Sequence, residues 1–291
     1  QKLQLNIHYS ATRNEGAGIK VVIYSPYIIL NRTGRDLFIS EKYNVLQSKV
    51  ETNDDMIKST APKMFSFEEK RDRGSRALVR LGDSQWSKPV SFEAIGRTSE
   101  VAMQLPNKKS EMNVGIDIKE GQGKYKLSKV VTISPRYIIK NNLQSGIEIL
   151  DIGSSDSLHL ESGKLEPLYK LPRVEEKQLK LRLPGGRSKW SSPFNIKDIG
   201  SIFLKVYEQD VGQVLLKVDV LLEESTLFIH IEDAKNRWPF SIRNFSDQEF
   251  IFYQKNPNLN ENDEVVTGDG TPFKPIYYKI PPKSVMPYAW D

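Results

Sequence analysis

Histidine and cysteine, two residue types that often perform catalysis, are scarce in this chain of 291 residues. It contains three histidines, His8, His159 and His230, and no cysteine. The histidines lie in unrelated contexts, with no Asp or Glu at a repeated spacing, so neither a metal site nor a histidine base has partners. The absence of cysteine excludes thiol nucleophiles and zinc–thiolate sites, and it favours a reducing compartment. The sequence therefore predicts a protein that is not an enzyme and that holds no metal or cofactor.

Phosphate-binding and hydrolytic patterns are also missing. The glycines of EGQGKY and LPGGRSKW lie between alternating apolar runs and are typical of hairpin turns, not of a phosphate-binding loop. Paired acids such as Asp54-Asp55 and Glu175-Glu176 fall in polar loops, with no facing carboxylate across a cleft. Acid–base hydrolysis is therefore not supported.

The most informative polar residue is an asparagine that recurs three times. It closes the segments Tyr27-Ile28-Ile29-Leu30-Asn31, Tyr137-Ile138-Ile139-Lys140-Asn141 and Phe240-Ser241-Ile242-Arg243-Asn244, each with a proline just upstream. The asparagines are separated by 110 and 103 residues, and an apolar strand begins six residues after each of them. Each repeat is thus expected to form a strand, a polar turn and a second strand.

Alternation along a strand places the aromatic residue, the isoleucine and the asparagine of each segment on one face, which we expect to be buried. A buried carboxamide must satisfy two donors and its acceptor sites, and the backbone of the following turn offers partners. We interpret Asn31, Asn141 and Asn244 as structural turn caps, while a direct ligand contact remains the alternative. Asn31 and Asn244 also match the glycosylation sequon, which an inward side chain would make coincidental.

A second signature divides the chain into modules. The segment Trp86-Ser87-Lys88-Pro89 recurs as Trp190-Ser191-Ser192-Pro193, 104 residues later, with alternating apolar runs before and after each copy. Period-2 alternation without capped helical stretches predicts antiparallel strands, and a unit of about 105 residues suits a β-sandwich. The expected fold is all-β, with sandwich modules at 1–108 and 109–220 and a third at 221–291 that is truncated or completed differently.

Two expectations concern the parts around these repeats. Trp86 and Trp190 occupy equivalent positions, which favours repeated core packing over carbohydrate platforms. The polar segments 51–76 and 254–272 lack strand character, so we expect solvated loops there. The apolar Ile28 and Leu30, on the outer face of the first repeat, indicate a contact with a neighbour or a ligand.

Charge and hydropathy limit the classes of partner. Lys and Arg number 42 and Asp and Glu 37, which gives a net charge of +5 with both signs interspersed. This pattern argues against nucleic-acid binding, and no apolar run is long enough to span a bilayer. Open sheet edges in several modules could instead accept an added strand from a peptide.

Taken together, the motifs SPYIILNRTG, WSKPVSFEAIG, VVTISPRYIIKNN, WSSPF and the terminal YAWD resemble one family. They are similar to the adaptor-binding region of the vacuolar protein sorting-thirteen proteins, near the segment once called the SHR-binding domain. The resemblance runs from about Lys20 to Asp291. It implies a curved array of β-sandwich modules, each with an asparagine that supports its module for adaptor binding and that maps onto Asn31, Asn141 or Asn244.

The resemblance also implies a function. Members of this family are bridge-like lipid-transfer proteins, and their modules bind short proline-x-proline peptides of endosomal, mitochondrial and sporulation-membrane adaptors by strand addition. We therefore expect a cytoplasmic scaffold that reaches endosomes, vacuoles, mitochondria and membrane contact sites indirectly. Candidate peptide-docking residues are Phe240, Ile242, Phe250 and Phe252. Direct binding to anionic membrane surfaces or lipid, and a purely structural spacer, are the alternatives.

Overall fold

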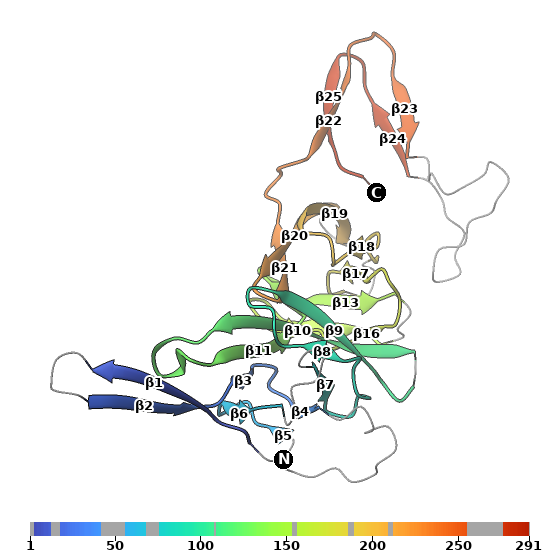
Figure 1. Ribbon diagram of the computed structural model, residues 1–291. Helices are drawn as coiled ribbons and strands as arrows, with labels where there is room; N and C mark the ends of the chain where they lie inside the picture. The colour runs from blue at the N-terminus through green and yellow to red at the C-terminus, as the bar shows by residue number, and fades with distance from the viewer. Residues whose placement is uncertain are drawn as a thin grey trace. The chain divides into compact units, whose positions relative to one another are not determined.

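A computed structural model describes residues 3–12, 18–41, 56–67, 76–107, 109–152, 156–185, 189–208, 212–254 and 276–290 (Figure 1). The fold is all-β, as predicted, and its one described helical element is the short 3₁₀ turn η3 (Gly123–Tyr125). The chain forms two compact units. The first comprises Gln1–Ile138, Pro167–Arg173 and Leu222–Leu227, and the remaining residues form the second.

The first unit is a sandwich of two sheets. One sheet has the strand order β16-β10-β11-β3-β6, with β9 on the free side of β10, and the other has the order β5-β4-β7-β8. The bounds are β3 (Tyr27–Asn31), β4 (Leu37–Ser40), β5 (Met56–Ile57), β6 (Lys63–Phe65), β7 (Arg76–Leu81), β8 (Val90–Ser91), β9 (Thr98–Gln104), β10 (Ser110–Glu120), β11 (Lys129–Pro135) and β16 (Lys170–Pro172).

The second unit contains a second sandwich. Its sheets have the orders β15-β12-β21-β20-β19 and β14-β13-β17-β18. The bounds are β12 (Tyr137–Asn141), β13 (Ile147–Asp151), β14 (Leu158–Leu160), β15 (Leu165–Pro167), β17 (Gln178–Arg182), β18 (Phe194–Asn195), β19 (Gly200–Glu208), β20 (Gly212–Glu223) and β21 (Thr226–Asp233).

The strand order of the two sandwiches is the same. The order β6-β3-β11-β10-β9 of the first sandwich corresponds strand by strand to the order β15-β12-β21-β20-β19 of the second. The four-stranded sheets β5-β4-β7-β8 and β14-β13-β17-β18 correspond in the same way. The sheet of β3 includes β10 and β11, so the first unit runs on to Ile138. The module bounds at residues 108 and 220 remain a prediction.

The equivalent pairs β3–β11 and β12–β21 depart from the antiparallel pattern. β3 and β11 run parallel, with Ile29 opposite Val131 and Asn31 opposite Ile133. In the second pair, the N–H of Leu227 donates to the carbonyl oxygen of Arg136 and the N–H of Asn142 to that of Ile231, so the bonds advance in the same direction along both strands. Two parallel neighbours need a long crossover, and here residues of the other sheet supply it.

Ile28 alternates with the core residues Tyr27 and Ile29 and is only 4% exposed, whereas Leu30 on the same face is partly exposed. The outer face of β3 is therefore covered within the chain at Ile28, and a ligand contact of Ile28 and Leu30 stays a prediction.

The interior of the first unit contains aliphatic strand residues and a group of rings. Tyr27, Phe65, Phe67 and Phe92 pack against one another, with ring centroids between 5.0 and 6.4 Å apart. Phe65 lies in β6, inside the segment 51–76 that lacks strand character in the sequence. The loop expectation is wrong for its described part, because β5 and β6 pair with β4 and β3 there. Residues 255–272 lie outside the described residues.

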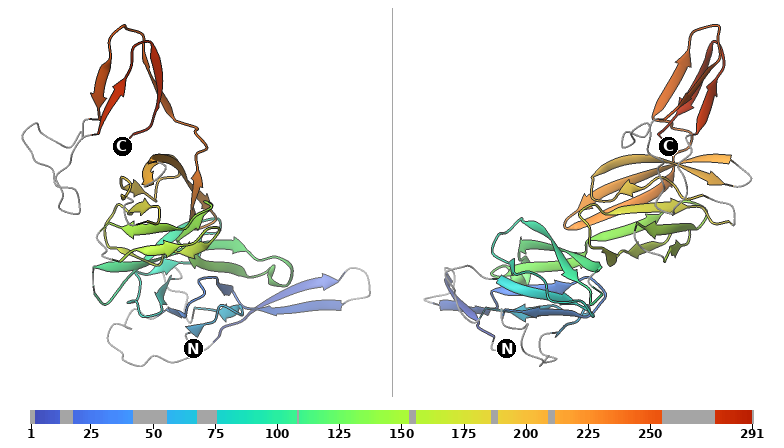
Figure 2. Two further views of the ribbon diagram at one scale, coloured as in Figure 1. Left: turned by 180° about the vertical axis from the view of Figure 1, so that it is seen from behind. Right: turned by 90° about the vertical axis from the view of Figure 1, so that its right-hand side faces the viewer.

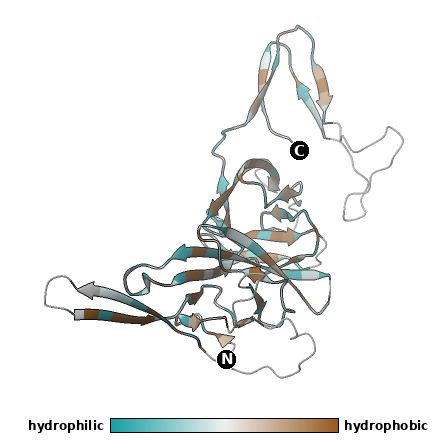
Figure 3. Cartoon of the chain, in the orientation of Figure 1, coloured by the Kyte–Doolittle hydropathy of each residue, from teal (hydrophilic) through white to brown (hydrophobic). Residues whose placement is uncertain are grey.

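A hairpin of β1 (Asn6–Thr12) and β2 (Gly18–Tyr24) precedes β3 and projects from the first sandwich (Figure 2). Its cross-strand pairs Ile7–Ile23 and Tyr9–Val21 gather apolar side chains on one face. All four are more than half exposed, and β2 shows long hydrophobic stretches while β1 is mostly paler (Figure 3).

The last described strands form two short antiparallel ladders in the second unit. β22 (Phe240–Asn244) pairs with β25 (Ser284–Tyr288), and β23 (Phe250–Tyr253) pairs with β24 (Tyr277–Ile280). Within the described residues neither ladder gains a third strand. The third asparagine repeat therefore has less sheet around it than the first two.

Candidate functional site

The three repeated asparagines occupy one structural position. Each ends its strand, β3, β12 or β22, and each side chain is buried, as the alternation predicted. The Nδ2 atom donates to the carbonyl oxygen four residues later, at 2.8 Å in Asn31, 2.9 Å in Asn141 and 2.7 Å in Asn244. The Oδ1 atom accepts from the backbone N–H two residues later, at 3.0 Å in every copy. The asparagine thus closes the turn that follows it.

Each asparagine also reaches a second strand pair. Nδ2 donates to the carbonyl oxygen of Ile57 on β5, of Leu160 on β14 or of Ile280 on β24, at 2.8, 3.0 and 3.2 Å. In both sandwiches this bond joins the sheet that holds the asparagine to the other sheet. A smaller side chain cannot span this gap while satisfying the turn, so the carboxamide connects two layers. The role of these residues in supporting an adaptor stays a prediction.

The hydroxyl of the third residue of each glycosylation sequon, Thr33 or Ser246, also forms a hydrogen bond in this turn. Thr33 Oγ1 donates to Asn31 Oδ1 at 2.7 Å, and Ser246 Oγ donates to Asn244 Oδ1 at 2.8 Å. The third residue of each sequon therefore completes the same turn. A buried, fully bonded carboxamide leaves no room for a glycan in this fold.

The tryptophans do not lie in the core, and the prediction of repeated core packing is wrong. Trp86 and Trp190 are half-buried, and each lies beside an arginine of the preceding strand. The guanidinium carbon of Arg80 is 5.5 Å from the ring centroid of Trp86, and that of Arg182 is 4.4 Å from Trp190. The serine after each tryptophan, Ser87 or Ser191, is buried. Because neighbouring side chains of an extended segment point to opposite sides, the tryptophan points toward the surface.

The candidate docking residues lie on one side of the third repeat. Phe240 and Ile242 alternate along β22, and Phe250 and Phe252 along β23. Phe240 is 47% exposed and Phe250 is 52% exposed, while Phe252 and Ile242 are partly buried. The expectation that the aromatic–isoleucine–asparagine face is buried is therefore wrong for this copy. The two short ladders supply too little sheet to cover that face.

Three further aromatic residues belong to this side, and the sequence reasoning missed them. The ring centroid of Phe252 is 5.4 Å from that of Tyr278 and 5.6 Å from that of Tyr288, and Trp290 is 5.8 Å from both Tyr288 and Phe240. The recurrence of aromatic residues in YYKI and PYAW was the available signal. We call Phe240, Phe252, Tyr278, Tyr288 and Trp290 the aromatic cluster.

A lysine from the second sandwich contacts this cluster. Lys205 on β19 donates from Nζ to the hydroxyl of Tyr278 at 3.0 Å, and Nζ lies 4.6 and 4.4 Å from the ring centroids of Tyr278 and Tyr288. A cation over two rings is favourable and holds both in place. The aromatic cluster is therefore positioned partly by β19.

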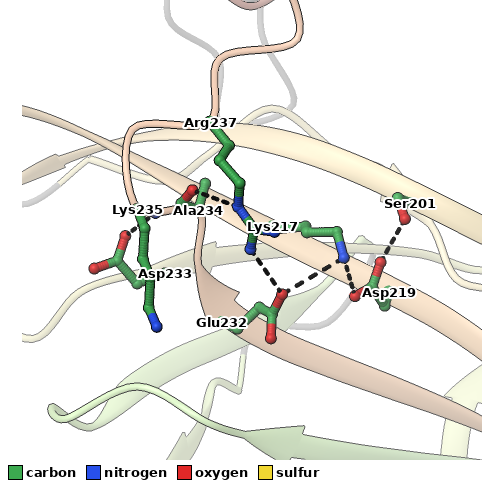
Figure 4. A network of polar contacts seen from close by, with 8 residues as sticks. All are labelled: Ser201, Lys217, Asp219, Glu232, Asp233, Ala234, Lys235 and Arg237. Carbon is green, nitrogen blue, oxygen red and sulfur yellow. Dashed lines mark hydrogen bonds and ion pairs between the residues drawn. The ribbon is translucent and has the colours of Figure 1, made fainter.

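Charged residues hold the segment that leads from β21 into β22 (Figure 4). Lys217 on β20 contacts Asp219 at 2.5 Å and Glu232 at 3.5 Å, and Arg237 of the connecting segment lies 3.7 Å from Glu232. Burial opposes ionisation of Asp219, but hydrogen bonds from Lys217 and Ser201 outweigh it, so its pKa lies below the usual range. The network ties Arg237 to the sandwich that precedes the third repeat.

No metal-binding cluster of His, Asp and Glu forms among the described residues. His8 lies on β1, His159 on β14 and His230 on β21, so they share no site. Gly123, in the sequence EGQGKY, has a φ of +56° and lies in the connection between β10 and β11, as expected of a turn. In the described part of the chain, no helix is long and apolar enough to cross a membrane.

Comparison with known proteins places this arrangement in a family. The family model of the adaptor binding domain of vacuolar-sorting associated protein 13 matches residues 1–291. The chain belongs to this adaptor-binding family. The intermembrane lipid transfer protein VPS13 of Chaetomium thermophilum is 42% identical over 99% of the chain. Drosophila melanogaster Vps13D is 25% identical over 82%, and mouse VPS13A is 24% identical over 96%.

These relatives are far longer than the chain. It spans 9% of the Chaetomium protein, 6% of the Drosophila protein and 8% of the mouse protein. The resemblance read from the repeated motifs is confirmed for the domain, because the adaptor-binding family covers the whole chain.

Proposed function

We propose that this chain is a non-enzymatic scaffold that binds proline-x-proline peptides of organelle-specific adaptors by strand addition. In this proposal it recruits a lipid-transfer protein to membrane contact sites from the cytoplasm. The adaptors would be endosomal, mitochondrial or sporulation-membrane proteins, and membrane association would be indirect, at endosomes, vacuoles or mitochondria. The observation that carries the proposal is that the half-exposed rings of Phe240 and Phe250, together with the partly buried aromatic cluster, lie on strands that have open edges among the described residues.

The open edges supply the backbone part of such binding. β22 and β25 pair only with each other in the described residues, so each has one unpaired edge. An unpaired edge presents N–H and C=O groups that an extended peptide can use. Phe240 and Phe250 are about half exposed. A bound peptide would cover their apolar surface and remove it from water, which is favourable.

The spacing of the two prolines suits this geometry. In an extended peptide, residues i and i+2 share both a face and an edge. Two prolines at this spacing can direct their nitrogen atoms, which lack hydrogen, away from the host strand while the middle residue forms both ladder bonds. Both proline rings then lie on one face, where they can contact aromatic rings. A peptide that must be ordered on binding is expected to bind with a Kd on the order of micromolar, near 8 kcal/mol.

Fluorescence polarisation of a labelled decapeptide with one proline-x-proline motif tests the proposal. We expect saturable binding that is lost when both prolines are replaced by alanine, because the ring contacts disappear. Methylation of the backbone nitrogen of the middle residue should also abolish binding, since it removes a ladder bond. Binding that tolerates both changes would contradict strand addition.

A matched pair of variants tests the location. Phe240→Ala combined with Phe250→Ala removes two candidate docking side chains. Ile251→Ala combined with Val285→Ala removes apolar side chains of similar exposure, 59% and 61%, from the opposite faces of the same ladders. We expect the first pair to weaken peptide binding about tenfold or more, because buried aromatic anchors dominate such interfaces, and the second pair to change it little. Equal effects would place the peptide elsewhere.

Flotation with vesicles containing phosphatidylserine distinguishes the membrane-surface alternative. The net charge of +5 would favour anionic vesicles, and such binding would fall steeply with salt. Vesicle binding without peptide binding would overturn the proposal, and binding of neither would favour a structural spacer.

A further inference from the structure

The first unit contains a groove that the function proposed above does not use. Its volume is about 700 Å³, and it runs beside β9. The lining comes from β8, β9 and the turn that carries Trp86 and Pro89. All of these residues belong to the first unit, so the groove is separate from the aromatic cluster.

One wall of the groove is an open strand edge. β9 pairs with β10 only, with Met103 opposite Met112. The carbonyl oxygen of Gln104 accepts from the N–H of Gln85 at 2.7 Å, so the backbone groups of Gln104 point away from β10. Backbone direction alternates along a strand, and the N–H and C=O groups of Ala102 and Glu100 therefore point away from β10 as well. These four groups form no backbone hydrogen bond to any other described residue.

The charge around this edge is positive. Four exposed cations line the groove, namely Arg76, Lys88, Arg97 and Arg173. None of them forms an ion pair within the described residues. The two carboxylates of the lining are already engaged: Glu100 lies 3.3 Å from Nε of Arg136 and accepts from the hydroxyl of Tyr137, and Glu111 has a partner as well.

The remaining wall is apolar. Trp86 and Pro89 face the groove, and Arg80, 5.5 Å from the centroid of Trp86, helps to hold the indole. The ring of Trp86, beside the open edge of β9, can contact one side chain of an added strand. Backbone groups, cations and an indole are the three elements of a site for an extended chain.

We propose that the β9 groove binds an acidic peptide segment in extended conformation, which adds as a strand to the edge at Glu100 and Ala102. Acidic side chains at alternate positions share one face, so they can approach Arg97 and Arg173 together. The unpaired cations give charge complementarity to this partner. The groove is independent of the docking site in the third repeat, so either site can fail without the other.

Fluorescence polarisation of three labelled nonapeptides tests the site. They alternate valine or threonine with glutamate, glutamine or lysine, which keeps strand propensity and varies charge. We expect the glutamate peptide to bind at least about tenfold more tightly than the other two, and its affinity to fall with salt because exposed charges are screened. Equal binding of the three, or binding of none, would overturn the proposal.

Two variants test the location. Arg97→Glu combined with Arg173→Glu reverses two exposed cations of the groove and should weaken binding of the glutamate peptide about tenfold or more. Lys20→Glu combined with Lys126→Glu makes the same charge change at exposed positions outside the groove, and we expect less than about a twofold effect. Equal weakening by both pairs would indicate general electrostatic attraction and overturn the site.

The backbone contribution has its own test. Ala102→Pro removes an outward N–H, which an edge strand tolerates, and it should weaken binding while the circular dichroism spectrum remains β-like. Methylation of alternate peptide nitrogens should have the same effect on the wild-type protein. Vesicles containing phosphatidylserine serve as the competing partner: vesicle binding that requires Arg97 and Arg173, without peptide binding, would overturn the peptide proposal.

Discussion

At the scale of single residues, the asparagine of each repeat does two things with one side chain. It closes a turn and it bonds a carbonyl of another strand pair, at Ile57, Leu160 or Ile280. Removing a buried amide leaves these partners without hydrogen bonds, at a cost of about 1 to 3 kcal/mol. Such a loss can loosen one end of a module without unfolding the chain. We therefore expect the asparagine to affect function through the shape of its own repeat.

Substitution of two of these asparagines separates support of the docking site from general stability. We expect Asn244→Ser to weaken binding of the proline-x-proline peptide more than Asn31→Ser, because only Asn244 holds the ladder pair of the third repeat together. Polarisation titrations measure the affinities, and circular dichroism should stay β-like for both variants. Equal loss of binding, or complete unfolding of either variant, would contradict this expectation.

Asp151, at the end of β13, is expected to make stability depend on pH. Burial raises its pKa to about 7, and the charge of Lys177 offsets this only in part. The pKa of an unfolded aspartate is about 3.9, so between these values the folded state binds more protons. The stabilising contribution is full below about pH 4 and is lost as the pH rises through 7.

Replacing this carboxyl by an amide tests the pH dependence. We expect the free energy of urea unfolding to fall less between pH 4.5 and 7.5 in Asp151→Asn than in the wild-type protein. Asp83→Asn changes an exposed carboxyl and should keep the wild-type slope. An unchanged slope in Asp151→Asn would show that Asp151 is not the group responsible.

At the scale of elements, the sequence predicts strands better than it predicts what covers them. Alternation located the asparagine strands, and β3 and β12 are buried where it placed them. It could not show that β3 pairs in parallel with β11, because that neighbour is about 100 residues away, nor that β22 lies in a ladder too small to bury Phe240. Burial depends on partners distant in the chain, which a local pattern does not contain.

The repeated Trp-Ser motif shows the same limit and gives a test. Ser191 Oγ accepts from the N–H of Leu181 at 3.1 Å and donates to the carbonyl of Ser192 at 2.8 Å. Ser191→Ala leaves a buried N–H without a partner, so we expect a loss of about 1 to 3 kcal/mol in the free energy of unfolding. Ser192→Ala, at an exposed neighbouring position, should cost less than about 0.5 kcal/mol. A denaturant titration in which the two variants are equally stable would exclude this role for Ser191.

At the scale of the whole molecule, the described chain contains two sandwiches with the same strand order and a third repeat built of two short ladders. The first two repeats each close two sheets over a core, whereas the third leaves aromatic residues about half exposed. In our proposals, a partner strand would complete the third repeat, which has only two short ladders in the described residues, and would use a free edge such as β9 where a sandwich is already closed.

This organisation predicts that damage to one repeat stays within its own unit. Among the described residues, the side chain of Asn31 bonds residues of the first unit and that of Asn141 bonds residues of the second. In hydrogen exchange read out by mass spectrometry, Asn31→Ser should speed exchange in β3, β4 and β5, and Asn141→Ser in β12, β13 and β14, because local opening becomes easier by about 1 to 3 kcal/mol. Asn107→Ser, at an exposed turn, should change little. Faster exchange throughout both units in either variant would mean that the chain unfolds as one cooperative body and would contradict the modular view.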